Sequence, residues 1–251
     1  MENEILLYYK YINIENPEEV TLAQKTLCRA LGFKGRIIIA KEGINGTLEG
    51  TKENTQKYID FMNGTDLFKD IDFKRSPGNG KEFPKLSIKH RNEIVSAHLG
   101  TDDLDPSRIT GKYLSVEQLH EWYRNGKEFY IIDMRNDYEH RSGYFKGSIL
   151  PKLSNFRDLP KILPDIEHLK NKTVVTVCTG GVRCEKASGY LVTKGFTDVF
   201  QLKNGIVTYM EKYPNEDFLG KLYVFDSRVL MGFNTESKNH KVVGHCEICG
   251  R

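Results

Sequence analysis

Residues 173–187 read Thr-Val-Val-Thr-Val-Cys-Thr-Gly-Gly-Val-Arg-Cys-Glu-Lys-Ala, a pattern that predicts a buried strand, a glycine loop and the start of a helix. The stretch Thr173 to Cys178 is largely apolar and β-branched, which is typical of a strand covered on both faces of its sheet. The helix is expected from Cys184 to Lys194. In open α/β sheets, ligands bind beyond the carboxyl ends of strands, so the sequence places a candidate site at the loop after this strand.

The residues of this loop suit a negatively charged sulfur. Its two glycines allow successive N–H groups to point inward and form an anion-binding nest. The positive end of the following helix and a nearby arginine charge act on the same point, and both favour a thiolate over a thiol. We therefore predict Cys178 as the reactive group, with an anion cradle formed by Thr179, Gly180, Gly181, Val182 and Arg183. A structural cysteine at a strand end is the alternative, but Cys-x-x-Gly-x-Arg between a strand and a helix favours the reactive thiol.

Strands alternate with helices on both sides of the loop. Strands are expected at 129–134, 173–178 and 198–202, with helices at 115–125, 156–169, 184–194 and 206–213. This alternation predicts an α/β domain with a parallel, doubly wound sheet over residues 113–217. Pro160 and Pro164 should break the second of these helices. Residues 218–251 are expected to be an irregular tail that ends in Cys246-x-x-Cys249.

A separate domain is predicted over residues 1–99, followed by a linker at 100–112. Its strands are expected at 6–14, 35–40, from 47, 70–75 and 86–97, with helices at 16–31 and 51–63 and a turn at 76–80. Asn16 and Pro17 should open the first helix as its cap and its first residue. The order β-α-β-β-α-β predicts a ferredoxin-like α+β fold.

The composition narrows the class of protein. The chain has 251 residues, of which 39% are hydrophobic and 28% charged, and it has no apolar run long enough for a signal peptide or a transmembrane helix. Five cysteines are an odd number, which argues against a disulfide framework and predicts a cytoplasmic protein without membrane contact. The net charge of +3 does not indicate a nucleic-acid binder by itself. Residues 73–91 contain six basic residues and a single acidic one, so this stretch is either a solvated face or a nucleic-acid contact. Its basic residues are Lys74, Arg75, Lys81, Lys85, Lys89 and Arg91.

The loop resembles the active loop of rhodaneses, in which the first loop cysteine becomes a persulfide. Asp133-Met134-Arg135 at the preceding strand end is similar to that family's Asp-x-Arg signature, and Tyr138-Glu139 matches the segment that follows. The resemblance implies a persulfide on Cys178, and we expect Asp133 and Arg135 to support the loop. Tyr144 departs from the family pattern, which has His there. Related phosphatases have one more residue between Cys and Arg, so this shorter loop favours sulfur over phosphate.

A second resemblance covers nearly the whole chain. A ferredoxin-like domain with Glu42-Gly43-Ile44-Asn45 ahead of Cys-Thr-Gly-Gly-x-Arg-Cys-Glu-Lys-Ala is similar to bacterial tRNA uridine hydroxylases of the TrhO type. Val224-Phe225-Asp226 with Arg228 also matches. The resemblance implies oxygen-dependent conversion of the tRNA wobble uridine to 5-hydroxyuridine, with the anticodon loop as partner and molecular oxygen as co-substrate. No dinucleotide fingerprint and no Walker sequence is present, so no cofactor is identifiable.

Several alternatives remain at this point. A sulfurtransferase that takes sulfur from thiosulfate or a protein persulfide would need only the central domain, and a non-catalytic sensor or adaptor would not need an intact Cys178. Cys184 either resolves a persulfide as a disulfide or is a small residue that opens a helix. Cys246 and Cys249, with His245, are half of a zinc-ribbon site, and without a second pair we predict no bound metal.

Overall fold

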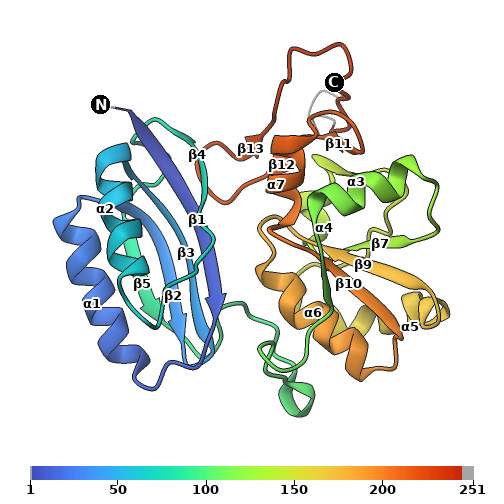
Figure 1. The fold of residues 1–251 in the computed structure, drawn as a ribbon, viewed down its shortest axis with the longest axis horizontal. Coiled ribbons are helices and arrows are strands. Elements are labelled where there is room, and N and C mark those ends of the chain that lie inside the picture. The colour runs from blue at the N-terminus through green and yellow to red at the C-terminus, as the bar shows by residue number, and fades with distance from the viewer. Residues whose placement is uncertain (1, 245–251) are drawn as a thin grey trace. The chain divides into compact units, whose positions relative to one another are not determined.

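The structure, a computed structural model, describes residues 2–244. The chain forms two compact units (Figure 1). One contains the residues up to Ser96 together with 226–228, and the other contains the rest of the described chain from Ala97 onward. No helix among the described residues is long and apolar enough to cross a membrane.

The first unit is a five-stranded sheet with two helices on one face. The strands are β1 (Asn3–Tyr11), β2 (Lys34–Ala40), β3 (Gly43–Thr51), β4 (Lys74–Gly78) and β5 (Leu86–His90). Their order is β4-β1-β3-β2-β5, and all neighbours are antiparallel except β2 and β5. The helices are α1 (Pro17–Ala30) and α2 (Lys52–Asn63). This topology confirms the predicted ferredoxin-like fold, with β5 added beside β2.

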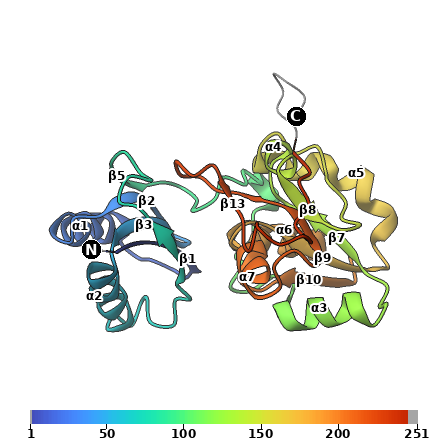
Figure 2. The same cartoon turned by 90° about the horizontal axis from the view of Figure 1, so that it is seen from above.

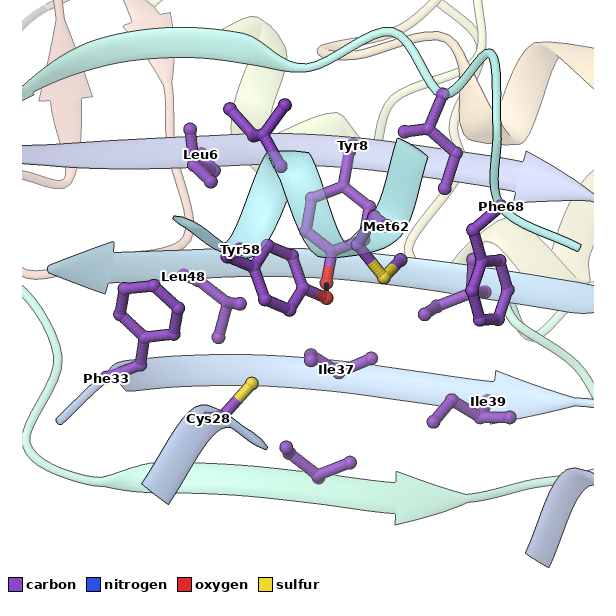
Figure 3. Packing of buried hydrophobic residues seen from close by; sticks show 14 of the residues in the cluster. Leu6, Tyr8, Cys28, Phe33, Ile37, Ile39, Leu48, Tyr58, Met62 and Phe68 are labelled. Atoms are coloured by element: carbon purple, nitrogen blue, oxygen red, sulfur yellow. Dashed lines mark hydrogen bonds between the residues drawn. The ribbon is translucent and has the colours of Figure 1, made fainter. Parts of the chain in front are cut away.

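The core of the first unit lies between the sheet and its helices (Figure 3). Leu6 and Tyr8 of β1 pack there against Tyr58 of α2 and Cys28 of α1. The buried hydroxyl groups are satisfied, because Tyr8 and Tyr58 share a hydrogen bond of 2.6 Å and Tyr58 donates to Gln24 Oε1 at 2.7 Å. These contacts fix which face of the sheet is covered by helices.

Four strand predictions in this unit were wrong in position. β3 begins at Gly43 rather than at 47, and β5 ends at His90 rather than at 97. β1 lies three residues earlier than expected at both ends, because it pairs with β3 along its full length, from Asn3 opposite Thr51 to Tyr11 opposite Gly43. β4 occupies residues 74–78, part of which was predicted as a turn. Pro77 is tolerated there because β4 is an edge strand that pairs only with β1.

The second unit contains a parallel sheet in the order β6-β10-β9-β7. The strands are β6 (Lys112–Leu114), β7 (Tyr130–Asp133), β9 (Thr173–Val177) and β10 (Asp198–Leu202). The helices are α3 (Val116–Arg124), α4 (Asp137–His140), α5 (Leu163–Ile166), α6 (Val182–Thr193) and α7 (Gly205–Lys212), with 3-10 turns η1 (Gly100–Asp102), η2 (Phe156–Ile162) and η3 (Glu167–Leu169). Four successive residues of β9, 174–177, are buried, so both faces of this sheet are covered (Figure 2). The predicted parallel α/β architecture is confirmed.

The segment after Pro214 is not wholly irregular, which corrects the expectation from sequence. β11 (Phe218–Gly220) pairs with β8 (Gly143–Phe145), and β12 (Leu222–Tyr223) pairs with β13 (Leu230–Met231). Strands of two or three residues are too short to show an alternating pattern, so the sequence could not reveal them.

Candidate active site

Cys178 is the first residue after β9, at the carboxyl end of a central strand of the parallel sheet. Its side chain is fully buried. The loop ends at Gly181, which caps α6 with a positive φ of 104°. The start of α7 holds the loop from the other side, because the amide of Ile206 donates to the Cys178 carbonyl at 2.9 Å and that of Val207 to the Thr179 carbonyl at 3.1 Å. Two helix starts therefore fix the backbone around this sulfur.

The sulfur of Cys178 accepts hydrogen bonds from its own loop. The Gly181 amide donates to Sγ at 3.2 Å, and the amides of Arg183 and Cys184 are directed at the same atom. The 12-residue helix α6 starts at this point, so its positive end also acts on the sulfur. Of the five residues predicted to cradle the anion, Gly181 and Arg183 direct their amides at the sulfur, and Cys184 joins them.

The balance of these effects favours the thiolate. Burial alone would raise the pKa of the Cys178 thiol. The hydrogen bond from the Cys184 thiol, the charge of Arg183 and the loop amides outweigh burial, so the pKa of Cys178 lies below the usual value of a cysteine. A thiolate is the nucleophilic form of cysteine, so this geometry can support covalent chemistry.

Cys184 lies in the first turn of α6 and is also fully buried. Burial, and then its hydrogen bond to Cys178 and the charge of that residue, raise the pKa of the Cys184 thiol well above its usual value. Cys184 therefore stays protonated and donates to Cys178. Both cysteines are free thiols in this structure. The role of Cys184 as a resolving thiol, one of the two alternatives for this residue, stays a prediction.

Arg183 is held by a buried carboxylate that the sequence analysis did not predict as its partner. Glu139 of α4 accepts from Arg183 Nη1 at 2.6 Å and from Nη2 at 3.0 Å, and the Glu139 side chain is completely buried. Thr179 also accepts from Arg183, at 3.3 Å. The guanidinium thus faces Glu139 while its charge still acts on Cys178. The one sequence signal for this partner was Glu139 within the Tyr-Glu pair after β7.

Asp133 and Arg135 lie at the end of β7 and have no exposed surface. Arg135 Nη2 donates to Asp133 Oδ2 at 2.6 Å and to the carbonyl of Gly143 at 2.7 Å. Although burial opposes it, the charge of Arg135 holds the pKa of Asp133 well below its usual range. The pair joins the end of β7 to β8, on the segment that carries α4 and Glu139.

Aromatic side chains line up beside Arg183. Its guanidinium carbon lies 6.0 Å from the ring centroid of Phe225, which is 45% exposed. Phe225 contacts Tyr223 edge to face at 5.3 Å, and Tyr223 contacts Tyr138 in the same way at 5.3 Å. A pocket of about 440 Å³ next to Tyr138 and Tyr223 is lined on its other sides by Arg141 and Leu230, among others. Phe225, Tyr223 and Tyr138 thus form a row of aromatic rings that begins beside Arg183 of the reactive loop.

The six basic residues predicted as a nucleic-acid contact are not gathered in one place. Lys74 and Arg75 belong to β4, while Lys89 belongs to β5 and Arg91 follows it. β4 and β5 are the two edges of the sheet, separated by three strands and therefore by roughly 19 Å. Arg75 is also engaged in an ion pair with Glu4 at 3.0 Å. These residues are close in the sequence but far apart in the structure, because β4 and β5 are not neighbouring strands of the sheet.

Two groups with metal-binding residue types need separate comment. His245, Cys246 and Cys249 lie outside the described residues. Within residues 2–244, the ligand atoms of His120, Glu216 and Asp217 lie close together. Asp217 already accepts from Arg124 at 2.6 Å and from the Tyr209 hydroxyl at 2.5 Å, so this group is accounted for as a hydrogen-bonded ion-pair network.

Comparison with known proteins agrees with the two-unit architecture. Residues 3–94 match the family described as UPF0176 acylphosphatase-like domain, and residues 115–212 match the rhodanese-like domain. A protein named tRNA uridine(34) hydroxylase from Bacillus licheniformis is 44% identical over 97% of this chain and 76% of its own length. The protein of the same name from Bacillus cytotoxicus is 45% identical over 96% of this chain and 74% of its own length.

Among solved structures, a rhodanese-like domain protein from Staphylococcus aureus is 26% identical, with a TM-score of 0.34, and covers 39% of this chain and 90% of that one. The identity to the Bacillus proteins extends over both units and includes the Cys178 loop within the matched range. The chain therefore belongs to the tRNA uridine(34) hydroxylase family.

Proposed function

We propose that the protein hydroxylates carbon 5 of uridine 34 in tRNA, with Cys178 as the nucleophile and molecular oxygen as co-substrate. The observation that carries the proposal is the thiolate-stabilising loop of Cys178 in a chain that matches named uridine(34) hydroxylases over 97% of its length. A tRNA substrate and three free cysteines among the described residues support a cytoplasmic location.

The chemistry follows from the electronic structure of uracil. Its C5–C6 double bond is conjugated to a carbonyl group, so addition of the Cys178 sulfur at C6 would move electron density to C5. Oxygen from O₂ then bonds to C5, the C5 proton leaves, and the carbon–sulfur bond breaks to restore the ring. The second oxygen atom leaves as water, which requires two electrons and two protons from a donor.

Cys184 has two possible roles in this scheme. As a resolving thiol it would supply the two electrons and two protons by closing a disulfide with Cys178, which a cellular thiol would then reduce. As a structural residue it would only donate the hydrogen bond that stabilises the Cys178 thiolate. Both roles need two electrons from an external reductant for each turnover: in the first the reductant opens the disulfide, and in the second it reduces the oxygen bound at C5 directly.

The surroundings of the loop support a pyrimidine substrate. A wobble base is already unpaired, so presenting it costs less than extruding a base from a duplex. The exposed ring of Phe225 beside Arg183 offers a surface on which such a base could stack.

Mass analysis of tRNA nucleosides from a strain that lacks the gene tests the proposal. We expect 5-hydroxyuridine at position 34 to disappear, to return with the wild-type gene, and to stay absent with Cys178→Ser. A hydroxyl group at neutral pH is a far weaker nucleophile than a thiolate, so this variant should fold normally but be inactive. Normal modification by a well-folded Cys178→Ser protein would exclude Cys178 as the nucleophile.

A second candidate function is sulfur transfer, which the rhodanese-like match over residues 115–212 favours. In that case Cys178 would carry a persulfide received from thiosulfate or from a protein persulfide. Thiosulfate turnover by the purified protein, together with unchanged 5-hydroxyuridine in the deletion strain, would favour this function over hydroxylation.

A further inference from the structure

The second unit contains a pocket that adjoins the helix behind the reactive loop. Its volume is about 440 Å³, and we call it the α4 pocket. α4 contributes to its wall and also supplies Glu139, which holds Arg183 of the reactive loop at 2.6 Å. All of its lining residues belong to the second unit and come from the segments 138–142, 220–223, 229–230 and 240–244.

A row of aromatic rings joins the reactive loop to this pocket. The row begins at Phe225, whose ring centroid lies 6.0 Å from the guanidinium carbon of Arg183. Phe225 contacts Tyr223, and Tyr223 contacts Tyr138, each edge to face with centroids 5.3 Å apart. Tyr223 and Tyr138 both line the pocket. The surface beside Arg183 therefore continues without interruption into the α4 pocket.

Large hydrophobic side chains are exposed around the pocket. Tyr138, Val229, Leu230 and Val242 all line it and are all exposed, and Phe225 extends the same patch toward Arg183. Exposed hydrophobic side chains that gather around a hollow mark a binding surface, whereas single ones scattered over a protein need no explanation. The volume falls within the range of roughly 300–1,000 Å³ that is usual for sites that bind one small molecule or group.

The charged groups of the pocket favour an anion. Its lining includes Arg141, Lys221 and His240 but no acidic residue. Arg141 has further interactions, whereas no carboxylate within residues 2–244 is paired with the partly exposed Lys221. An anionic group that enters the pocket thus meets the Lys221 ammonium and no opposing charge from the lining. Aromatic rings together with a cation are the combination by which proteins hold single-stranded nucleic acid, through stacked bases and a neutralised phosphate.

We propose that the α4 pocket binds the nucleotide next to uridine 34 in the anticodon loop, with its base against Tyr223 and Tyr138 and its phosphate at Lys221. The inference rests on the proposed tRNA substrate and adds a second binding position to the same site. A uridine bound beside Phe225 has its neighbour in the RNA at the next ring of the row. Both nucleotides must be unpaired, because a base held in a duplex has no free face for these rings.

A double-mutant cycle between protein and RNA tests the base contact. The protein is the full chain with Cys178→Ser, which prevents turnover, and the ligands are an anticodon stem-loop RNA and two versions that lack the base on one side or the other of uridine 34. One of the two abasic RNAs should bind on the order of ten-fold more weakly. Tyr223→Ala should cause a similar loss with the intact RNA and no further loss with that abasic RNA, because the base that the ring contacts is already absent.

Two control variants accompany this cycle. Tyr223→Phe keeps the ring and should bind like the parent. Tyr113→Ala removes another exposed tyrosine ring of the second unit, from β6 at the opposite edge of the sheet from β7, and should leave binding unchanged. Thermal unfolding of each variant shows whether a weaker affinity reflects a lost contact or lost folding.

Charge reversal tests the phosphate contact separately. Lys221→Glu should weaken stem-loop binding and lower the magnitude of the slope of log affinity against log salt by about 0.7. Lys172→Glu is the matched control, because Lys172 is a surface lysine that pairs with Glu128 just before β9, at the opposite end of this strand from Cys178. The control should leave both the affinity and the slope unchanged.

The outcomes separate this inference from the proposed function. Equal affinity for the intact and both abasic RNAs, or additive losses from Tyr223→Ala and the missing base, would overturn the inference, and hydroxylation by the wild-type protein would still stand. A fully paired duplex that binds as tightly as the stem-loop would also contradict it. Conversely, a non-additive cycle in a protein that forms no 5-hydroxyuridine would support the pocket and exclude the proposed reaction.

Discussion

Cys178 shows how a buried sulfur can carry charge. Burial opposes ionisation, but the Cys184 thiol, the Arg183 charge and the loop amides all stabilise the thiolate. Arg183 can act in this way because Glu139 holds its guanidinium at 2.6 Å in the interior. Removing one partner of such a buried pair leaves the other uncompensated, so the reactive loop depends on a carboxylate from α4.

The first prediction at this scale concerns the hydrogen bond from Cys184. The reactive form of Cys178 is the thiolate, so activity should rise with pH through the pKa of Cys178 and then level off. Cys184→Ala removes a donor to the charged form, which raises the pKa of Cys178 and should move the rising limb to higher pH by roughly one to two pH units. The measurement is single-turnover hydroxylation across pH.

Cys184→Ser is the matched control, because its hydroxyl group can still donate to the thiolate. A profile close to that of the wild type would assign Cys184 a structural role. If Cys184→Ser instead loses all activity, including the first turnover, the Cys184 thiol takes part in the electron transfer. An unshifted profile in Cys184→Ala would contradict the hydrogen-bond account of Cys178 activation.

The sequence could identify Cys178 but not its supporting carboxylate. Cys178 and its loop are contiguous, so their spacing is visible in the chain. Glu139 is 44 residues away from Arg183, so the Tyr-Glu pair that contains it did not show which residue it would contact. The same limit applied to the basic residues, whose spacing in the chain did not show that β4 and β5 form opposite edges of a sheet.

At the scale of elements, the loop is positioned by the start of α7 as much as by β9 and α6. Gly205, the first residue of α7, has a φ of +74°, and a Cβ built there would lie 2.7 Å from the Cys178 carbonyl oxygen and from the backbone of Gly180 and Gly181. Only glycine fits this contact without moving the loop.

Gly205→Ala should therefore lower the free energy of unfolding by roughly 2–4 kcal/mol, since an unfavourable φ and a clash with backbone atoms add together. Gly195→Ala is the control, because Gly195 has a φ of +90° but no atom within 4 Å of a built Cβ. It should cost only about 1–2 kcal/mol. Urea unfolding measures both, and equal losses would contradict the close approach at Gly205.

The sequence predicted elements well where they are long. The strand before Cys178 and the order of helices and strands in both units are visible as continuous apolar runs and caps, and Asn16 does accept from the Glu19 amide as a helix cap. β11, β12 and β13 were missed because they have two or three residues. The limits of β1 and β4 depend on their partners across the sheet, which no local pattern contains.

At the scale of the whole molecule, the proposed nucleophile belongs to the second unit. That unit holds Cys178 in a loop that favours the thiolate, and the first unit is the ferredoxin-like sheet with its two helices. A simple sulfurtransferase would need only the rhodanese-like part, whereas identity to the Bacillus hydroxylases extends over both.

The most direct test is hydroxylation of unmodified tRNA by the purified protein under ¹⁸O₂, with a thiol reductant and mass analysis of the nucleosides. The account predicts 5-hydroxyuridine at position 34 that carries one ¹⁸O atom, formed by the wild-type protein and not by a folded Cys178→Ser variant. Product labelled from water, or equal product from Cys178→Ser, would contradict it.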